Sequence, residues 1–207
     1  VSLVQALQDS GSQSITLAPE AGSERLRRAI AKGVTQQDLL DAAKMLAGRF
    51  SSLKLYYMIG LPSETDADVD EIAALSAEAQ RAFSREVVVN VTPFVPKAHT
   101  PYEREAVCSE RMVDERLRRL QSLCRARRLP FRGEAARQAQ VQAVLARGDE
   151  AVGEALLAQE QPGMRGFWRA LEQQGLEAKR YLEAQPAEAT LPWGFVALQA
   201  QRAGEAS

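Results

Sequence analysis

The sequence contains very little cysteine, and this shortage limits the metal chemistry that the chain can support. Its 207 residues include two cysteines, Cys108 and Cys124, and neither belongs to a CxxC pair. Closely spaced thiolates are the usual sign of a zinc or iron–sulfur site. A metal site built on these two residues is therefore not expected, and their scarcity favours a reduced, cytoplasmic protein.

Long apolar runs and an excess of charge of one sign are also missing. No stretch approaches the ~20 apolar residues that are needed to cross a bilayer. The formal net charge is −1, which provides no general attraction to nucleic acid or to anionic lipid. We therefore predict a cytoplasmic protein with no membrane partner and no nucleic-acid partner.

A glycine-rich phosphate loop is absent as well. Neither GxGxxG nor GxxxxGK[ST] occurs, which disfavours an ordinary nucleotide-binding βαβ domain. Present instead are three motifs that each end a short apolar run: residues 18–23 (APEAGS), 58–65 (MIGLPSET) and 91–97 (VTPFVPK).

The spacing of these motifs predicts consecutive strand–helix units. The apolar runs begin near Ile15, Lys54 and Val87, and one such unit with its loops takes roughly 30–40 residues. The loops that carry the motifs should then emerge at the same end of a parallel sheet. Ligand sites of open α/β proteins lie at that carboxyl end of the strands.

Alternating side chains predict that one face of this sheet is buried under helices. The buried face is expected to carry Leu53, Leu55, Tyr57 and Ile59 from one strand and Val87, Val89 and Val91 from the next. Helices are expected near 24–32, 36–48 and 66–82, with Ser23, Thr35 and Thr65 as their N-caps and Asp38 completing a capping box.

The opposite face of the sheet is expected to be more polar. It carries Thr16, Lys54, Asn90 and Thr92, and Glu20 shares its alternation with Thr16. Polar groups on a sheet face need hydrogen-bond partners. Either a barrel interior that holds a polar ligand or bonds within the sheet would supply them.

After residue 101 the pattern becomes helical. Helices are expected near 110–128, 134–147, 149–160 and 164–174, with an extended segment at 129–132. Cys124 lies on the apolar stripe of the first of these helices, so we interpret it as a core thiol.

Taken together, the motifs resemble the second half of the catalytic barrel in radical S-adenosylmethionine enzymes. The resemblance covers nearly the whole chain. Within this family, the chain is most similar to an uncharacterised bacterial subfamily that often carries a cobalamin-binding-type domain at its N-terminus. It is carried by residues 17–33 (LAPEAGSERLRRAIAKG), 54–62 (KLYYMIGLP) and 93–101 (PFVPKAHTP), and in the tail by 147–149 (RGD), Trp168 and 191–193 (LPW).

The resemblance implies an α/β fold with a defined domain organisation. Residues 1–102 would form three β/α units of a partial (β/α)6 barrel. Residues 103–203 would form a mainly helical C-terminal extension, and 204–207 a disordered tail.

The resemblance also implies a set of residues that bind S-adenosylmethionine. Glu20 would contact the ribose or methionyl part of the cofactor, and Lys32 would pair with its carboxylate. The end of the second strand would contact the adenine mainly through backbone, because a glycine lets the chain approach closely. The full set is Glu20, Ser23, Lys32, Tyr56, Ile59 and Gly60.

One departure from the family pattern affects activity. The family's CxxxCxxC motif follows the first barrel strand, and this sequence contains no such motif. The chain begins within what the resemblance makes the third helix, so we expect it to be a fragment of a longer protein. A [4Fe–4S] cluster needs thiolate ligands that are absent here, so this chain alone is expected to be inactive, with an unknown substrate.

Two functions follow from this departure. The chain is either a fragment that contributes the S-adenosylmethionine-binding half of a radical enzyme, or a non-catalytic binding or scaffold module that pairs with a separate cluster-bearing polypeptide. In both cases the expected partner of this chain is the missing N-terminal half of the barrel or a complementary polypeptide that supplies it. The exposed edge of the strand at 14–18 would also favour self-association.

Overall fold

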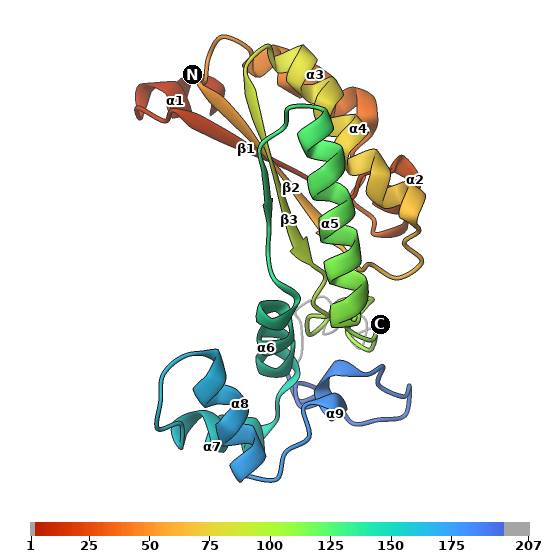
Figure 1. Ribbon diagram of the computed structural model, residues 1–207, viewed down its shortest axis with the longest axis vertical. Coiled ribbons are helices and arrows are strands. Elements are labelled where there is room, and N and C mark those ends of the chain that lie inside the picture. The colour runs from red at the N-terminus through yellow and green to blue at the C-terminus, as the bar shows by residue number, and fades with distance from the viewer. Residues whose placement is uncertain (1–2, 197–207) are drawn as a thin grey trace, which may run out of the picture. The chain divides into compact units, whose positions relative to one another are not determined.

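A computed structural model describes residues 3–196 (Figure 1). Within that range the chain forms two compact units. The first comprises residues 3–94 and 108–136, and the second comprises residues 95–107 and 137–196. Each unit is described separately below.

The first unit is built on a parallel sheet whose strand order follows the sequence. The order is β1-β2-β3-β4, and each neighbouring pair is parallel. The predicted α/β class and the parallel pairing of the first three strands are thus confirmed. The strands are β1 (Ser14–Glu20), β2 (Ser52–Ile59), β3 (Glu86–Pro93) and β4 (Phe131–Gly133).

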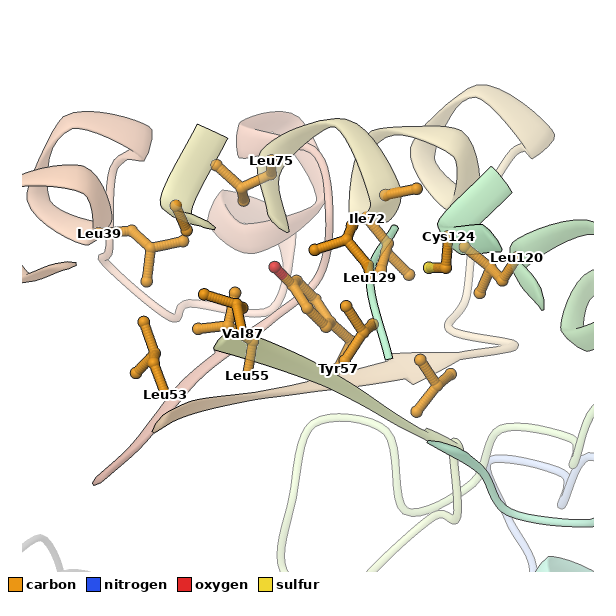
Figure 2. Close-up of a cluster of buried hydrophobic side chains, with 14 of the residues drawn as sticks. Leu39, Leu53, Leu55, Tyr57, Ile72, Leu75, Val87, Leu120, Cys124 and Leu129 are labelled. Atoms are coloured by element: carbon orange, nitrogen blue, oxygen red, sulfur yellow. The ribbon is translucent and has the colours of Figure 1, made fainter. Parts of the chain in front are cut away.

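Helices cover one face of this sheet, as the alternation predicted (Figure 1). Side chains from that face meet the helices in one hydrophobic core, which Figure 2 shows. Leu53, Leu55 and Val87 are fully buried there, and Tyr57 bonds through its hydroxyl to Ser76 at 3.0 Å. The helices are α1 (Leu3–Asp9), α2 (Glu24–Ala29), α3 (Gln36–Leu46), α4 (Asp66–Phe83) and α5 (Glu110–Ala126).

The predicted N-caps are confirmed. Ser23, Thr35 and Thr65 each accept a hydrogen bond from the backbone of the first helical turn. Thr35 forms the expected capping box with Asp38, and Thr65 forms a second box with Asp68. These boxes fix the entry of the chain into α3 and α4.

Helix α2 is shorter than predicted. It ends at Ala29, and Ala31 adopts a left-handed conformation with φ of +54°. The amide of Lys32 then donates to the Arg27 carbonyl at 2.9 Å, which closes the helix end. Lys32 therefore lies in the loop after α2 and not in its last turn.

Strand β1 contains a bulge that the alternation did not predict. Leu17 pairs with Leu55, but the next pair joins Glu20 to Tyr57, so two residues of β1 lie opposite one residue of β2. Glu20 itself has a φ of +69°. The simple alternation that placed Glu20 on the face of Thr16 is therefore interrupted before it reaches Glu20.

The polar face of the sheet is partly satisfied by its own backbone. Asn90 donates from Nδ2 to the carbonyl of Val88 at 3.3 Å and lies 3.5 Å from that of Leu55. For Asn90, bonding within the sheet is thus observed. Thr16 is exposed, and Lys54 and Thr92 are half-buried.

Residues 108–136 pack with the sheet, whereas the resemblance implies a helical extension that begins at 103. Val113, Leu120 and Cys124 of α5 enter the same core as the strands, so the predicted core position of Cys124 is confirmed. Strand β4 adds to the edge of β3. Its three residues are too few for an alternating pattern to mark them.

The second unit is helical and has a smaller core. Its buried side chains include Val144, Phe167, Leu171 and Tyr181. Its helices are α6 (Ala136–Arg147), α7 (Glu150–Leu157), α8 (Met164–Gln173) and α9 (Lys179–Leu182). The first three agree with the predicted helices to within a few residues. The tail at 204–207 lies outside the described residues, and every helix of residues 3–196 is too short or too polar to cross a membrane.

Candidate functional site

The carboxyl ends of the first three strands lie together at one end of the sheet. Parallel register places the end of β1 beside β2 and the end of β2 beside β3. The loops at 21–23 and 60–65 therefore emerge at the same end, as the motif spacing predicted. We consider this end, where α/β sheets bind ligands, as the candidate site.

Glu20 and Lys32 form an ion pair at this end. The Lys32 ammonium lies 3.3 Å from a carboxylate oxygen of Glu20. Their side chains are 28% and 31% exposed, so both charges remain in contact with water. Such a pair contributes little to stability, and either partner is free to exchange for a ligand group.

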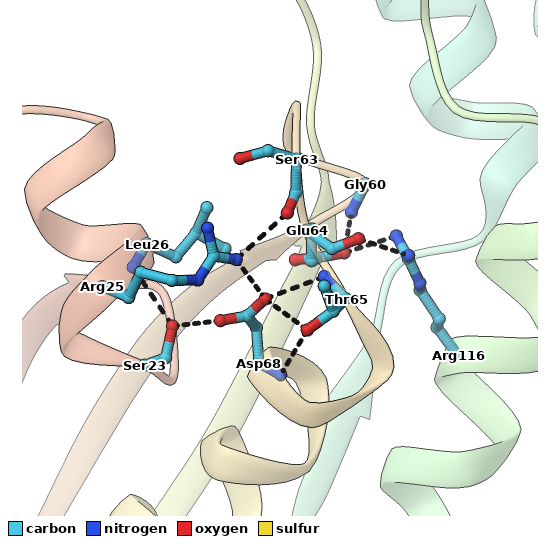
Figure 3. Close-up of polar contacts among 9 residues, drawn as sticks. All are labelled: Ser23, Arg25, Leu26, Gly60, Ser63, Glu64, Thr65, Asp68 and Arg116. Carbon is cyan, nitrogen blue, oxygen red and sulfur yellow. Dashed lines mark hydrogen bonds and ion pairs between the residues drawn. The ribbon is translucent and has the colours of Figure 1, made fainter.

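Ser23 is engaged inside the protein. Its hydroxyl accepts from the Leu26 amide at 3.1 Å and donates to a carboxylate oxygen of Asp68, as Figure 3 shows. The side chain is buried. Ser23 therefore links the loop after β1 to the start of α4, and its hydroxyl has no hydrogen left to donate to a ligand.

Asp68 is the centre of this link. Its carboxylate accepts from Ser23, from the Arg25 guanidinium, and from the Thr65 amide and hydroxyl at 2.8 and 2.7 Å (Figure 3). Burial alone would raise the pKa of Asp68, but the bonds from Arg25, Ser23 and Thr65 outweigh it and lower that pKa well below its usual range. Asp68 is thus a fixed anion that ties two loops together.

A second ion pair, Glu64–Arg116, holds the loop after β2. Glu64 accepts from the Gly60 amide at 2.6 Å and from an Arg116 Nη at 2.5 Å (Figure 3). The two side chains are 1% and 10% exposed. Burial raises the pKa of Glu64 to about 7, while the Gly60 amide and Arg116 lower it in part. This pair joins the turn to α5 inside the protein.

The turn itself depends on Gly60. Its φ of +81° lies in the left-handed region. A Cβ at this position would lie 2.7 Å from the Cβ of Cys108. Gly60 therefore lets two segments of the chain approach closely. The resemblance implies a close approach to adenine at this position, whereas the neighbour observed here is Cys108, and the Gly60 amide is already bonded to Glu64.

Tyr56 and Ile59 have different surroundings. Tyr56 lies on the opposite face from the core, and 39% of its surface is exposed. The Ile59 side chain is fully buried, and its carbonyl accepts from the Phe94 amide at 2.8 Å. Of the six residues assigned by resemblance, Glu20, Lys32 and Tyr56 thus present side chains to solvent at this end.

Arg27 and Gly22 shape the loop after β1. The buried guanidinium of Arg27 donates to the carbonyls of Ala21 and Gly22 at 3.1 and 2.6 Å and to that of Val34 at 2.8 Å. A Cβ on Gly22 would lie 2.4 Å from the backbone nitrogen of Ile72 in α4. These contacts hold the loop against α4 and so position Glu20 beside Lys32.

Sequence reasoning missed the residues that build this frame: Arg27, Glu64, Asp68 and Arg116. Thr65 followed by Asp68 matches the spacing of a capping box, so that signal was available. The Glu64–Arg116 pair spans 52 positions in the chain, and nothing local in the sequence marks it.

The thiols do not fit an iron–sulfur cluster. Cys124 is buried in the core, and burial raises its pKa to about 11. Cys108 is half-buried, and burial raises its pKa as well. In the part of the chain that the structure describes, no three His, Cys, Asp or Glu side chains gather in a metal-binding arrangement.

Comparison with known proteins finds a similarity to an archaeal protein. The chain is 34% identical over 140 residues to the uncharacterised protein MJ0966 of Methanocaldococcus jannaschii. The match covers 67% of this chain and 31% of that protein, so the chain spans about a third of the relative's length. No family model matches the chain, and no solved structure matches it.

Proposed function

We propose that this chain contributes part of the S-adenosylmethionine-binding side of a radical S-adenosylmethionine protein. The observation that carries the proposal is the accessible Glu20–Lys32 pair at the carboxyl end of a parallel sheet. Both residues occupy the positions that the motif resemblance assigns to the cofactor. The greater length of the archaeal relative is in keeping with a larger parent protein.

The two charged side chains suit the methionyl end of the cofactor. That end carries an ammonium and a carboxylate, which complement the Glu20 carboxylate and the Lys32 ammonium. The pair is solvated, so a ligand that exchanges partners with it has a small desolvation cost. Ser23 and Gly60 act indirectly in this proposal, because their polar groups hold the two loops through Asp68 and Glu64.

S-Adenosylmethionine supplies a sulfonium group for reductive cleavage, and that cleavage needs a cluster that the thiols of this chain do not fit. We therefore propose that the cluster-bearing half belongs to additional polypeptide. The second candidate is a non-catalytic module that binds such a polypeptide; the buried Cys124 is compatible with both candidates, because neither places the cluster on this chain. A reading frame that encodes CxxxCxxC upstream of Val1 would favour the enzyme.

Calorimetric titration of the full chain with S-adenosylmethionine tests the proposal. We expect weak binding, no tighter than about millimolar, because the iron that would chelate the methionyl group is missing; each 1.4 kcal/mol lost weakens affinity about tenfold. Glu20→Ala should weaken it several-fold further.

The matched control is Glu86→Ala, which removes an exposed glutamate at the opposite end of the sheet. It should leave the affinity unchanged. Low-micromolar binding that Glu20→Ala does not alter, or an equal loss in both variants, would show that the cofactor does not bind at this end.

A further inference from the structure

Two short motifs from the C-terminal part of the sequence meet at one pocket in the second unit. The segment at 147–149 (RGD) joins α6 to α7, and the segment at 191–193 (LPW) lies more than forty residues later. Both line a cavity of about 60 Å³. The proposed function uses neither motif, and nothing in the first unit explains their convergence.

The pocket contains a buried cation without an acidic partner. Arg147 is 3% exposed, and its two Nη atoms donate to the carbonyls of Glu105 at 2.9 Å and Glu183 at 3.0 Å. Among residues 3–196 it forms no ion pair. Burial lowers its pKa, and no carboxylate offsets that effect. A buried guanidinium is costly when neutral oxygens are its only partners.

The acid that lines the pocket is already neutralised. Asp149 accepts from the Tyr181 hydroxyl at 3.0 Å and from the Arg180 guanidinium at 3.1 Å. It also caps α7 through the Val152 amide. The charges of Arg180 and Asp149 therefore cancel, and the net charge of the pocket is the single positive charge of Arg147.

An apolar wall completes the pocket. Leu191, Pro192 and Trp193 line it together with Thr190. The indole nitrogen of Trp193 donates to Glu103 at 2.7 Å, which fixes the orientation of the ring. A guanidinium with an adjacent apolar wall suits an anionic group that is attached to a short carbon chain.

We propose that this pocket binds the carboxylate group of a small organic acid, with Arg147 as its cationic partner and Trp193 beside its carbon chain. The volume of about 60 Å³ is roughly that of two water molecules, which suits a carboxylate head. A single net positive charge matches a monoanion. A phosphate dianion would bring a second negative charge that no unpaired cation of the pocket offsets.

The test is an NMR titration of the full chain with sodium acetate, against sodium chloride at equal ionic strength. The sequence contains two tryptophans, so two indole N–H signals are expected. Trp193 lines the pocket, and Trp168 packs against the helical core, where it serves as an internal reference. We expect a saturable shift of the Trp193 signal in the millimolar range, with phosphate binding several-fold more weakly.

Two variants and one control sharpen the result. Arg147→Gln should weaken acetate binding at least tenfold. Because Arg147 also holds two carbonyls, Thr190→Phe provides an independent variant that fills the pocket from an exposed position; it should abolish saturation. Arg169→Gln removes an exposed arginine of α8 outside the pocket and should keep the affinity within twofold.

Several outcomes would overturn the proposal. A linear shift, or an equal shift with chloride, would show that no carboxylate site exists. Saturation that persists in Thr190→Phe, or that is lost equally in Arg169→Gln, would show that the acetate binds elsewhere. Tighter binding of phosphate than of acetate would overturn the assignment of the ligand to carboxylates.

Discussion

The end of β1 and the loop after β2 each contain a glutamate paired with a basic residue, but the two pairs differ in their surroundings. The Lys32 ammonium nitrogen lies 3.3 Å from a carboxylate oxygen of Glu20, and roughly three-tenths of each side chain is exposed. An Arg116 guanidinium nitrogen lies 2.5 Å from a carboxylate oxygen of Glu64, and the Glu64 side chain is 1% exposed. Water competes for the first pair and is excluded from the second.

This difference separates a pair that a ligand can reach from a pair that is enclosed by the protein. An exposed pair gives up a partner at low cost, so Glu20 and Lys32 are available to a ligand. Removal of one partner from a buried pair leaves an uncompensated charge, which is strongly destabilising. Chemically similar glutamates at one end of the same sheet thus differ in accessibility, and burial leaves only Glu20 within reach of a ligand.

Arg116→Ala should have the largest effect on stability. It leaves the Glu64 carboxylate buried without a cation and should lower the free energy of unfolding by about 3–5 kcal/mol. Urea denaturation followed by circular dichroism measures this change. Arg118→Ala, an exposed position on the same helix, should change it by less than about 0.5 kcal/mol. Equal effects of the two variants would remove the distinction between the pairs.

The pH dependence of the Arg116→Ala effect provides a further check. The pKa of Glu64 is about 7 in the folded chain and about 4.3 in an unfolded one. Protonation of Glu64 therefore stabilises the folded chain. This stabilisation is fully present below about pH 4.3 and is lost as the pH rises through about 7. The destabilisation by Arg116→Ala should be larger at pH 8 than at pH 5, where a protonated Glu64 needs no cation. An effect that is larger at pH 5 would contradict this assignment.

Gly60→Ala should have an intermediate effect of about 2–3 kcal/mol. The new methyl group meets Cys108 at 2.7 Å, and the backbone has a φ of +81°. Gly48→Ala is a matched control, because Gly48 has a φ of +73° but no heavy atom within 4 Å of the added Cβ. Gly48→Ala should lower the free energy of unfolding by only about 1 kcal/mol, the cost of a left-handed backbone conformation for a residue with a Cβ. If the two variants are equally stable, the contact with Cys108 is unimportant.

Glu20→Gln should have the smallest effect on folding. Loss of a partly exposed pair costs about 1 kcal/mol or less, so the same denaturation experiment should barely distinguish this variant from the parent. A double-mutant cycle with Lys32→Met should give a coupling energy in that range. A coupling above about 2 kcal/mol would mean that the pair is structural, and the comparison with Glu64–Arg116 would fail.

Local patterns in the sequence predicted most of the sheet unit. The alternation of Leu53, Leu55 and Tyr57 identified the buried face, and Ser23 and Thr65 marked the starts of α2 and α4. These features depend on residues that are close together in the chain. Periodicity and capping chemistry therefore suffice to predict them.

Features that depend on distant residues could not be predicted in the same way. The Glu64–Arg116 bond joins two elements that only the folded sheet brings together. Strand β4 has too few residues for a pattern, and its place is fixed by pairing with β3. In the candidate site, the resemblance assigned Glu20, Lys32, Ser23 and Gly60 to the cofactor, and that assignment stays a prediction. Only the folded structure revealed that the Ser23 hydroxyl and the Gly60 amide are already occupied.

The bulge near the end of β1 affects how the chain tolerates changes in length. A one-residue deletion within a regular strand turns every later side chain to the opposite face. Here residues 18 and 19 lie opposite Tyr56 alone, so β1 already carries one surplus residue. Deletion of Ala18 would restore one-to-one pairing between Leu17 and the end of the strand, whereas deletion of Thr16 would shift Ile15 out of the core. Sequences with this fold should therefore vary in length at residues 18–19 and keep the length of 14–17 constant.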